Sequence, residues 1–420
     1  MKKVLAFILT LAMVFSLVAC GNKPTDDPGK EEGLGAKEIV IGFVGPLTGP
    51  SAMLGEGVLK GLQMAEEEIN AAGGIKGVPV KIVYRDDESD PTKSLTYTEE
   101  LIYKEGAKFL VGQCNSACAG ATAEFTTSEK ILVLHTVATS PTLIDEQKYP
   151  YSFRFHAPND IQAEALVKIA KDEGYQSAIY MGDTSDLGVS GAAAVKEYAA
   201  QYGLNVVDYV EYVAGSADLT PVANQIKASG APVILSFALG ADAAKILTAL
   251  DRIDYLNSVS LLGYTGTSSA EVVNLAQQLD LSKCAGVQLI NGVCMPDMKM
   301  APTAQWGYDK VNEKYGTFTV DGSGRTISHI EIIKAYEMPF MIKWMVEATG
   351  TLDSDTNKAY LEEHGTEFDS LVWETNYRTA ADRHEGFNPD SLVPVKLGGE
   401  AGEEYGYHND IVFHRDCKLG

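Results

Sequence analysis

The sequence predicts an α/β protein of two doubly wound, Rossmann-like lobes. From Lys37 onward, short apolar runs typical of buried parallel strands alternate with segments of helical periodicity. The alternation begins a second time after Pro158. Without an N-terminal targeting segment the chain still has about 400 residues, which is more than one ordinary core accommodates.

The first series of elements is expected between residues 39 and 134. Its opening strand, 39–44, ends at a loop rich in Gly and Pro. The helix after it should bury one face and end at a Gly-Gly pair, with Val58, Leu62, Ala65 and Ile69 inward before Gly73 and Gly74. Strands are then expected at 80–84, 109–111 and 131–134, and a helix capped by Asp90 starts at Pro91.

The second series repeats this pattern. We expect helices at 160–173, 190–202, 221–228 and 241–252, and strands at 177–180, 206–212, 233–237 and 261–262. The last third is more helical. It should contain a long helix at 328–348 and two late strands, 393–396 and 411–413, that return to the second lobe.

The N-terminus has the features of an export signal. Lys2 and Lys3 precede an uncharged run, 4–18, which is shorter than the roughly 20 apolar residues of a membrane span. The run ends at Cys20 after small residues, a pattern that resembles the bacterial lipobox, whose Cys is diacylated. An ordinary signal peptide with a chance Cys, or a buried helix, is the alternative.

A signal peptide at 1–19 would therefore leave a lipidated, flexible tether at 20–36. Residues 22–36 are rich in Pro, Gly and charge and cannot bury enough surface to fold. Two acyl chains at Cys20 would anchor the protein to the cell membrane more firmly than one chain does.

Charge and motif content exclude several classes of function. The formal charge is −23, and −25 once Lys2 and Lys3 are removed, so the chain is not a nucleic-acid binder. The acidity suits an extracytoplasmic protein or simply aids solubility. The sequence has no GxxxxGK[ST], GxSxG or HExxH pattern, so we expect neither catalysis nor a cofactor.

Titratable residues outside these patterns have ordinary structural interpretations. Asp86 and Asp87 are expected to cap a loop rather than act as acid and base. The late histidines are expected to pack or lie on the surface: His364, His384, His408 and His414.

Cysteine usage is compatible with an oxidising compartment. Besides Cys20 there are five cysteines, so at least one stays unpaired: Cys114, Cys118, Cys284, Cys294 and Cys417. Cys284 and Cys294 are plausible disulfide partners, while Cys114 and Cys118 bridge each other or neither. The spacings do not fit a zinc site, so no metal is expected.

Loop segments at the carboxyl ends of the expected strands carry a family resemblance. Three are GPLTGPSAMLG at 45–55, VGQCNSACAGATAEF at 111–125 and HTVATSPTLID at 135–145. NAAGGIKG at 70–77, RDDESDP at 85–91 and YSFRFHAPND at 151–160 add to them. In this order and spacing they resemble the periplasmic receptors of the branched-chain amino acid family.

This resemblance implies a type I periplasmic binding fold, with two lobes, a three-strand hinge and a cleft that closes on the ligand. Lobe one would comprise 37–156 plus 292–390, and lobe two 157–291 plus 391–420. It also implies an extracytoplasmic solute-binding lipoprotein that passes a small carboxylate, first of all a branched-chain amino acid, to ABC permease subunits. A ligand sensor for a signalling partner is the alternative.

The resemblance also implies which residues bind the ligand. Ser116 and Thr139 match the Ser and Thr that hold the ligand carboxylate, beside Asn115 and a helix N-terminus whose partial positive charge attracts an anion. The carbonyl group of Ala138 would accept a hydrogen bond from a ligand amino group.

Three positions depart from the family pattern. Leu54 stands where an aromatic residue often covers the ligand, Leu187 where a Tyr often precedes the Gly, and Thr265 where amino-acid binders often have an acid. His329 lies near a common Tyr and either faces the cleft or packs. Because a buried ammonium group without a carboxylate partner is costly, an aliphatic or aromatic carboxylate fits as well as an amino acid.

Overall fold

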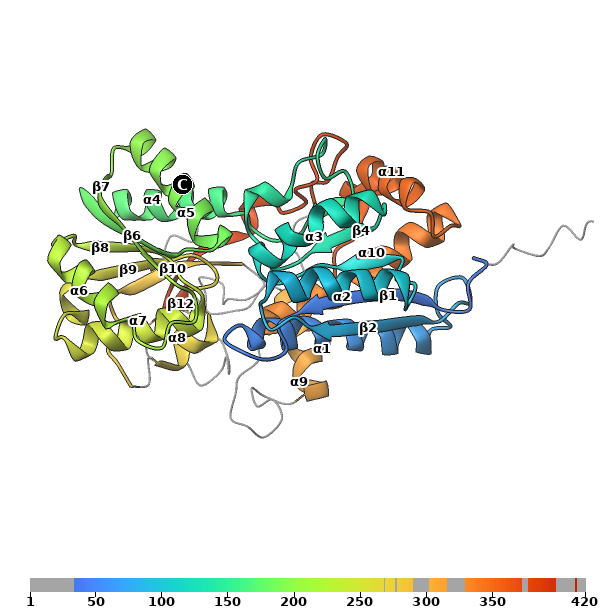
Figure 1. Ribbon diagram of the computed structural model, residues 1–420, viewed down its shortest axis with the longest axis horizontal. Helices are drawn as coiled ribbons and strands as arrows, with labels where there is room; N and C mark the ends of the chain where they lie inside the picture. The colour runs from blue at the N-terminus through green and yellow to red at the C-terminus, as the bar shows by residue number, and fades with distance from the viewer. Residues whose placement is uncertain are drawn as a thin grey trace, which may run out of the picture.

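The computed structural model of the protein describes two α/β lobes (Figure 1). The described residues are 34–267, 269–275, 278–289, 302–315, 329–371, 377–397 and 412–413. The expected signal peptide, the lipidation residue Cys20, most of the tether, His408 and His414 lie outside these ranges.

The first lobe is built on a five-stranded parallel sheet with the order β2-β1-β3-β4-β5. Every residue of four of these strands is buried, as expected for a sheet covered on both faces. The strands are β1 (Ile39–Gly45), β2 (Val80–Asp86), β3 (Phe109–Val111), β4 (Leu132–His135) and β5 (Ser152–Arg154).

The helices of this lobe come from two distant parts of the chain. From the N-terminal part come α1 (Ala52–Ala71), α2 (Pro91–Tyr103) and α3 (Ser116–Ser128), and from the C-terminal part α9 (Pro302–Tyr315), α10 (His329–Thr349) and α11 (Ser354–His364). Asp90 caps α2 as predicted, because its carboxylate accepts hydrogen bonds from the N–H groups of Thr92 and Lys93.

Helices α1 and α10 pack closely along each other. A Cβ atom on Gly61 of α1 would lie 2.1 Å from the carbonyl oxygen of Ile332 in α10. The two backbones approach this closely only because residue 61 has no side chain. The contact joins the C-terminal part of the chain to the first lobe.

The second lobe is built on a seven-stranded sheet with the order β12-β11-β10-β9-β8-β6-β7. The strands are β6 (Ser177–Asp183), β7 (Asn205–Tyr212), β8 (Val233–Phe237), β9 (Ser260–Gly263), β10 (Cys284–Leu289), β11 (Leu392–Lys396) and β12 (Val412–Phe413). The first five are parallel, and β11 is antiparallel to its neighbours. The helices are α4 (Asn159–Asp172), α5 (Asp186–Tyr202), α6 (Thr220–Ser229), α7 (Gly240–Arg252) and α8 (Ala270–Leu275).

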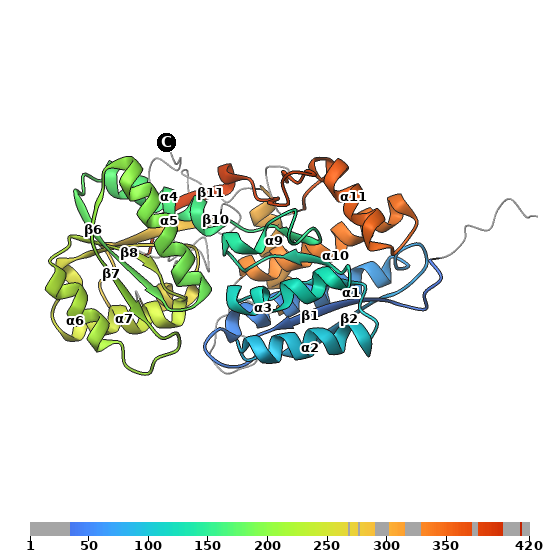
Figure 2. The same cartoon turned by 45° about the horizontal axis from the view of Figure 1, so that its top comes forward.

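The late strands return to the second lobe as predicted, and β11 pairs with β10 on the side nearest the first lobe (Figure 2). The chain passes between the lobes at 155–158, before α4, and again at 386–391, before β11. The connection that follows β10 lies outside the described residues. In both lobes the parallel strands follow the doubly wound order in which the first strand lies between the second and the third. Ligands of such sheets bind at the carboxyl ends of the strands.

Three expectations need correction. The loop expected at 111–125 is short, because α3 begins at Ser116. Helix α5 begins at Asp186, so Leu187 lies in its first turn rather than in a loop. The thiols of Cys114, Cys118 and Cys284 are buried and free. Of the two alternatives for Cys114 and Cys118, the one without a bridge therefore holds, and Cys284 lacks the plausible disulfide with Cys294, which lies outside the described residues.

Candidate functional site

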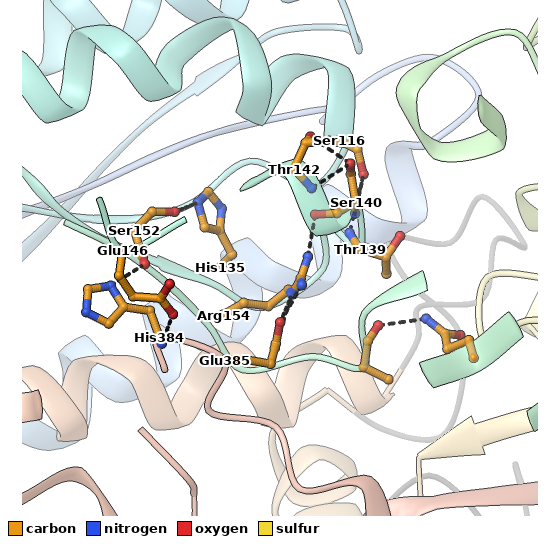
Figure 3. Close-up of polar contacts among 12 residues, drawn as sticks. Ser116, His135, Thr139, Ser140, Thr142, Glu146, Ser152, Arg154, His384 and Glu385 are labelled. Carbon is orange, nitrogen blue, oxygen red and sulfur yellow. Dashed lines mark hydrogen bonds and ion pairs between the residues drawn. The ribbon is translucent and has the colours of Figure 1, made fainter. Parts of the chain in front are cut away.

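The hydroxyl group of Ser116 joins the loops that follow β3 and β4. Its oxygen accepts hydrogen bonds from the N–H groups of Thr139, at 3.3 Å, and Ser140, at 3.2 Å (Figure 3). Ser116 and Thr139 are both buried, as is Ala138, which packs in a small apolar cluster with Ala119 of α3 and Leu143. Because both bonds occupy the oxygen of Ser116 as an acceptor, its hydroxyl hydrogen remains as a donor.

The N-terminus of α3 has no side-chain cap. Asn115 occupies the N-cap position, but its side chain makes no capping hydrogen bond. Its Nδ2 instead donates to the hydroxyl group of Ser51 at 3.3 Å, and among the described residues its Oδ1 has no partner. The first N–H groups of α3 therefore keep the partial positive charge that attracts an anion.

The loop after β1 is held by a carboxylate from β2. Asp86 accepts hydrogen bonds from the N–H groups of Leu47, at 2.8 Å, and Thr48, at 3.3 Å, and from the Thr48 hydroxyl group at 2.7 Å. Partial burial opposes ionisation of Asp86, but these bonds outweigh it and lower its pKa. Asp86 thus caps a loop, as predicted, and holds the chain just before Leu54, which is half-buried in the first turn of α1.

Asn159, the first residue of α4, connects the two lobes. Its N–H group donates to the carbonyl oxygen of Thr139 at 2.9 Å, and its Nδ2 donates to the carbonyl oxygen of Leu187 at 3.2 Å. Thr142 and Asp186 add a contact at 3.4 Å between the loop after β4 and α5. The predicted residues Thr139 and Leu187, from different lobes, are thus linked through one residue, Asn159.

The loop after β9 is tied to the same region by Gln162 of α4. Thr265 donates its N–H group to Oε1 of Gln162 at 2.9 Å, and Nε2 of Gln162 donates to the carbonyl oxygen of Ala157 at 2.7 Å. Thr265 is therefore buried next to the first crossing between the lobes. Thr265 makes the contact with Gln162 through its backbone N–H group, and it brings no charged side chain to the site.

The first two turns of α10 contribute two charged residues that the sequence analysis missed. His329 is the first residue of α10, but its side chain lies outside the described part of the structure. Glu331 and Lys334 follow on the same helix and form an ion pair of 2.8 Å while both are buried. Their i, i+3 spacing is that of an ordinary surface ion pair, and no sequence signal indicates burial.

A second ion pair, between buried Arg154 and partly buried Glu385, supports the loop after β4. Nε of Arg154 contacts both carboxylate oxygens of Glu385, at 3.1 and 2.8 Å, and Nη1 donates to the carbonyl oxygen of Ser140 at 2.6 Å (Figure 3). His384 donates its N–H group to Glu146 at 2.8 Å. The segment that leads to the second described crossing is thus fixed against β5 and the loop that carries Thr139.

Two buried histidines near this region, His135 and His156, have lowered pKa values. Burial, followed by the charge of Arg154, lowers the pKa of His135 to about 3. Burial, followed by the charge of Lys334, lowers the pKa of His156 well below its usual value. His384 is packed, as predicted, in a stacked contact with Phe153 whose ring centroids are 3.8 Å apart.

Buried polar atoms without hydrogen-bond partners concentrate at the carboxyl ends of the strands. Within the described ranges Asn115 Oδ1, Thr136 Oγ1, His156 Nδ1, Tyr212 Oη and Ser269 Oγ lie at or after strand ends, while Asn159 Oδ1, Glu331 Oε2 and Lys334 Nζ lie near the starts of α4 and α10. Since buried polar groups are normally hydrogen-bonded, this distribution indicates a polar ligand or water at the edge where both sheets end.

The described residues contain no helix long and apolar enough to cross a membrane, and no group of His, Cys, Asp or Glu side chains arranged to hold a metal ion.

Comparison with known sequences identifies a family. Residues 38–400 match a family model described as a periplasmic binding protein. The Leu/Ile/Val-binding protein homolog 3 of Brucella melitensis is 29% identical over 200 residues, which cover 47% of this chain and 53% of that protein. The leucine-, isoleucine-, valine-, threonine-, and alanine-binding protein of Pseudomonas aeruginosa is 30% identical over 199 residues, or 47% of this chain and 52% of that protein. The aligned region thus spans about half the length of these curated relatives.

Solved structures match the fold over most of the chain. A periplasmic binding protein type 1 from Bordetella pertussis superposes with a TM-score of 0.77 at 20% identity, covering 90% of this chain and 99% of that chain. The branched-chain amino acid transporter substrate binding protein LivJ from Streptococcus pneumoniae, solved with isoleucine, superposes with a TM-score of 0.71 at 20% identity over 86% of this chain and 96% of that chain. At this identity the match establishes the arrangement of the lobes and not the ligand.

Proposed function

Because the chain belongs to the periplasmic binding protein family, we propose that it is the extracytoplasmic solute-binding component of an ABC importer and captures a small carboxylate between its lobes. Its mechanism is hinge closure: the ligand binds one lobe, and rotation about the crossing segments buries it against the other. The closed protein then presents the ligand to permease subunits. Capture requires no chemical step.

The observation that carries this proposal is the hydroxyl group of Ser116. It lies at the uncapped N-terminus of α3 and receives two backbone hydrogen bonds from the loop after β4. Its remaining hydrogen and the free N–H groups of α3 are all donors, so the matching ligand group is a carboxylate. Thr139 would add its hydroxyl group, and Asn115 and the carbonyl group of Ala138 would complete the polar end.

The apolar part of the ligand would extend toward Leu54 and Leu187, which approach the same loops from the two lobes. Thr265 and His329 would lie at its far end. Leucine side chains at two positions where the family often has aromatic residues favour an aliphatic ligand over a large planar one. The curated relatives carry names that refer to leucine, isoleucine and valine binding, which favours the same class.

We also propose that Cys20 is lipidated and holds the protein at the outer face of the cell membrane. The support is the positive N-terminus, the uncharged run before Cys20 and the polar tether up to residue 36. The division of the folded part into 37–156 plus 292–390 and 157–291 plus 391–420 belongs to the same proposal. Mass spectrometry of the membrane-associated protein tests for the lipid on Cys20. Replacement of Cys20 with Ala should also release the protein from the membrane.

A ligand screen tests the function. Leucine, isoleucine, valine, isocaproate and benzoate are added to the purified protein, and its thermal unfolding is followed. A ligand present at 100 times its Kd should stabilise the protein by about 2.7 kcal/mol. The variant Ser116→Ala should lose most of this shift, because it lacks the donor and releases the loop after β4.

The control for that variant is Ser128→Ala at the other end of α3, where the hydroxyl group bonds only to the carbonyl group of Phe125. Its ligand response should equal that of the unchanged protein. A full ligand shift in Ser116→Ala would remove the carboxylate assignment. No response to any ligand of the panel would contradict the proposed ligand class.

A further inference from the structure

Two loops from opposite lobes touch each other at the side of the molecule that lies away from the crossings. We call them the lip loops: residues 46–51 after β1 and residues 213–216 after β7. A Cβ atom on Gly215 would lie 3.4 Å from Cγ of Pro50, which is an ordinary van der Waals contact. The contact joins a glycine backbone to a proline ring, so it depends on the position of the two lobes and not on charge.

The sheet orders place this contact far from the crossings. In the first lobe, β1 is three places from β5, which leads into the crossing at 155–158. In the second lobe, β7 is four places from β10, the neighbour of β11 after the crossing at 386–391. Since adjacent strands are about 4.8 Å apart, these separations are roughly 14 and 19 Å. A hinge rotation of about 10° would therefore move the lip loops apart by roughly 2–3 Å, which breaks a van der Waals contact.

The lip loop of the second lobe is held by a buried carboxylate from α7. Oδ2 of Asp242 accepts a hydrogen bond from the N–H group of Gly215 at 2.8 Å, and Oδ1 of Asp242 accepts one from Nζ of Lys245 at 3.0 Å. Lys245 also donates to the carbonyl oxygen of Ser216 at 3.0 Å. Asp242 is buried, while Lys245 is partly exposed. The two side chains thus fix the backbone on both sides of Gly215.

Both lip loops are held in the same manner before they meet. Gly215 has a φ of +76°, which a residue with a side chain adopts only with strain, so the turn presents a bare backbone to the first lobe. The lip loop of the first lobe is held by Asp86, which accepts hydrogen bonds from the N–H groups of Leu47 and Thr48. Because each loop is ordered by its own lobe, little conformational entropy is lost when the two loops come into contact.

We propose that the lip loops form a latch that keeps the closed protein shut, and that Asp242 and Lys245 are positioning residues for this latch. The proposal rests on the proposed hinge closure, but it concerns release of the ligand and not its recognition at Ser116. Opening must break the latch before the ligand leaves, whereas the open form that takes up a ligand has no lip contact. The latch therefore slows dissociation and has little effect on association. It adds to the contact of Thr142 with Asp186, which follows strands nearer the crossings.

The first test asks whether the lip loops meet in solution, and it needs no ligand. The Cβ atoms of a disulfide are about 3.5–4.5 Å apart, and Cγ of Pro50 is one bond from its own Cβ, so residues 50 and 215 are within this reach. The full chain with Pro50→Cys and Gly215→Cys should form a disulfide between these positions when it is treated with oxidised glutathione. Peptide mass spectrometry identifies the bond, and each single Cys variant is a control. Because Gly215 has a positive φ, Pro50→Cys with Ser216→Cys is a second pair, and absence of the bond in both pairs would overturn the latch.

The second test measures the rates of binding and release by stopped-flow fluorescence of the purified protein, with leucine as the first probe and the other acids of the panel after it. Asp242→Ala and Pro50→Gly should each raise the dissociation rate about 3- to 10-fold and leave the association rate within about 2-fold. Asp218→Ala is the matched control, because this carboxylate follows the lip loop and accepts the N–H group of Thr220 within the second lobe. Both rates should be unchanged in this control.

The two rates separate a latch from a purely structural role. Unchanged dissociation in both variants, or a loss of stability with equal changes in both rates, would overturn the latch and leave the proposed function standing. If no acid of the panel binds, the proposed ligand class is wrong, and the disulfide test still decides whether the latch exists.

Discussion

The side chains of Arg154, which is buried, and Glu385, which is partly buried, form an ion pair although they are 231 positions apart in the chain. Arg154 is the last residue of β5, and Glu385 belongs to the segment that leads into the second described crossing between the lobes. Through Nη1, Arg154 also holds the carbonyl group of Ser140, next to Thr139. One guanidinium group thus fixes the hinge segment and a ligand-site loop together.

Replacement of Arg154 alone should lower the free energy of unfolding more than replacement of both Arg154 and Glu385. Arg154→Met leaves Glu385 and the carbonyl group of Ser140 without their donor and should lower the free energy of unfolding by about 3–5 kcal/mol. Arg154→Met/Glu385→Leu removes the uncompensated charge and should recover part of this loss. Urea unfolding at pH 7 measures both, and a double variant no more stable than Arg154→Met would contradict the explanation.

The packing of α1 against α10 should depend on the absence of a side chain at residue 61. Gly61→Ala places a methyl group against the carbonyl oxygen of Ile332 and the N–H group of Tyr336, neither of which can rotate away. We expect a loss of about 1–3 kcal/mol, measured by urea unfolding. Gly120→Ala is the control, because a Cβ atom at this exposed position of α3 meets nothing within 4 Å and should be neutral or slightly stabilising.

Much of the fold was predictable because its strands are fully buried. The run 109–111 is wholly apolar and 233–237 is apolar except for Ser236, and both are strands with those bounds. Helix α3 was not predicted, because its Ala, Ser, Thr and Gly residues give no clear apolar face. Its start was visible only through the resemblance that marked Ser116.

Only the site residues that lie in the quoted loop segments could be predicted from the sequence. The resemblance brought Ser116 and Thr139 together, and the structure shows that they touch. Glu331 and Lys334 could not be found in this way, since burial of their helix turn depends on packing between segments far apart in the chain. Asn159 lay within the quoted segment 151–160, but its contact with Leu187 depends on the approach of the two lobes.

Acid should destabilise the protein partly through His135. Its pKa is about 3 in the folded state, mainly because of burial, and near 6.5 when the chain is unfolded. The unfolded state therefore binds more protons between these values, so the stability from His135 is present above pH 6.5 and is lost as the pH falls toward 3. In His135→Asn, unfolding should take up about one proton fewer in this window. Parallel stability-versus-pH curves for the two proteins would show that His135 does not contribute.

The loop after β1 should depend on the carboxylate of Asp86. Asp86→Ala removes the acceptor for Leu47 and Thr48, which lie 39 and 38 positions away, and should cost about 1–3 kcal/mol in urea unfolding at pH 7. It should also weaken ligand binding, since Leu54 and Ser51 follow directly on this loop. Asp145→Ala is the matched control: its carboxylate accepts two backbone hydrogen bonds, from Gln147 and Lys148, but both are local to one exposed turn. We expect a smaller loss of stability and unchanged ligand affinity there, because an exposed local turn re-forms its hydrogen bonds with water, whereas the chain around Leu47 is held by a distant strand.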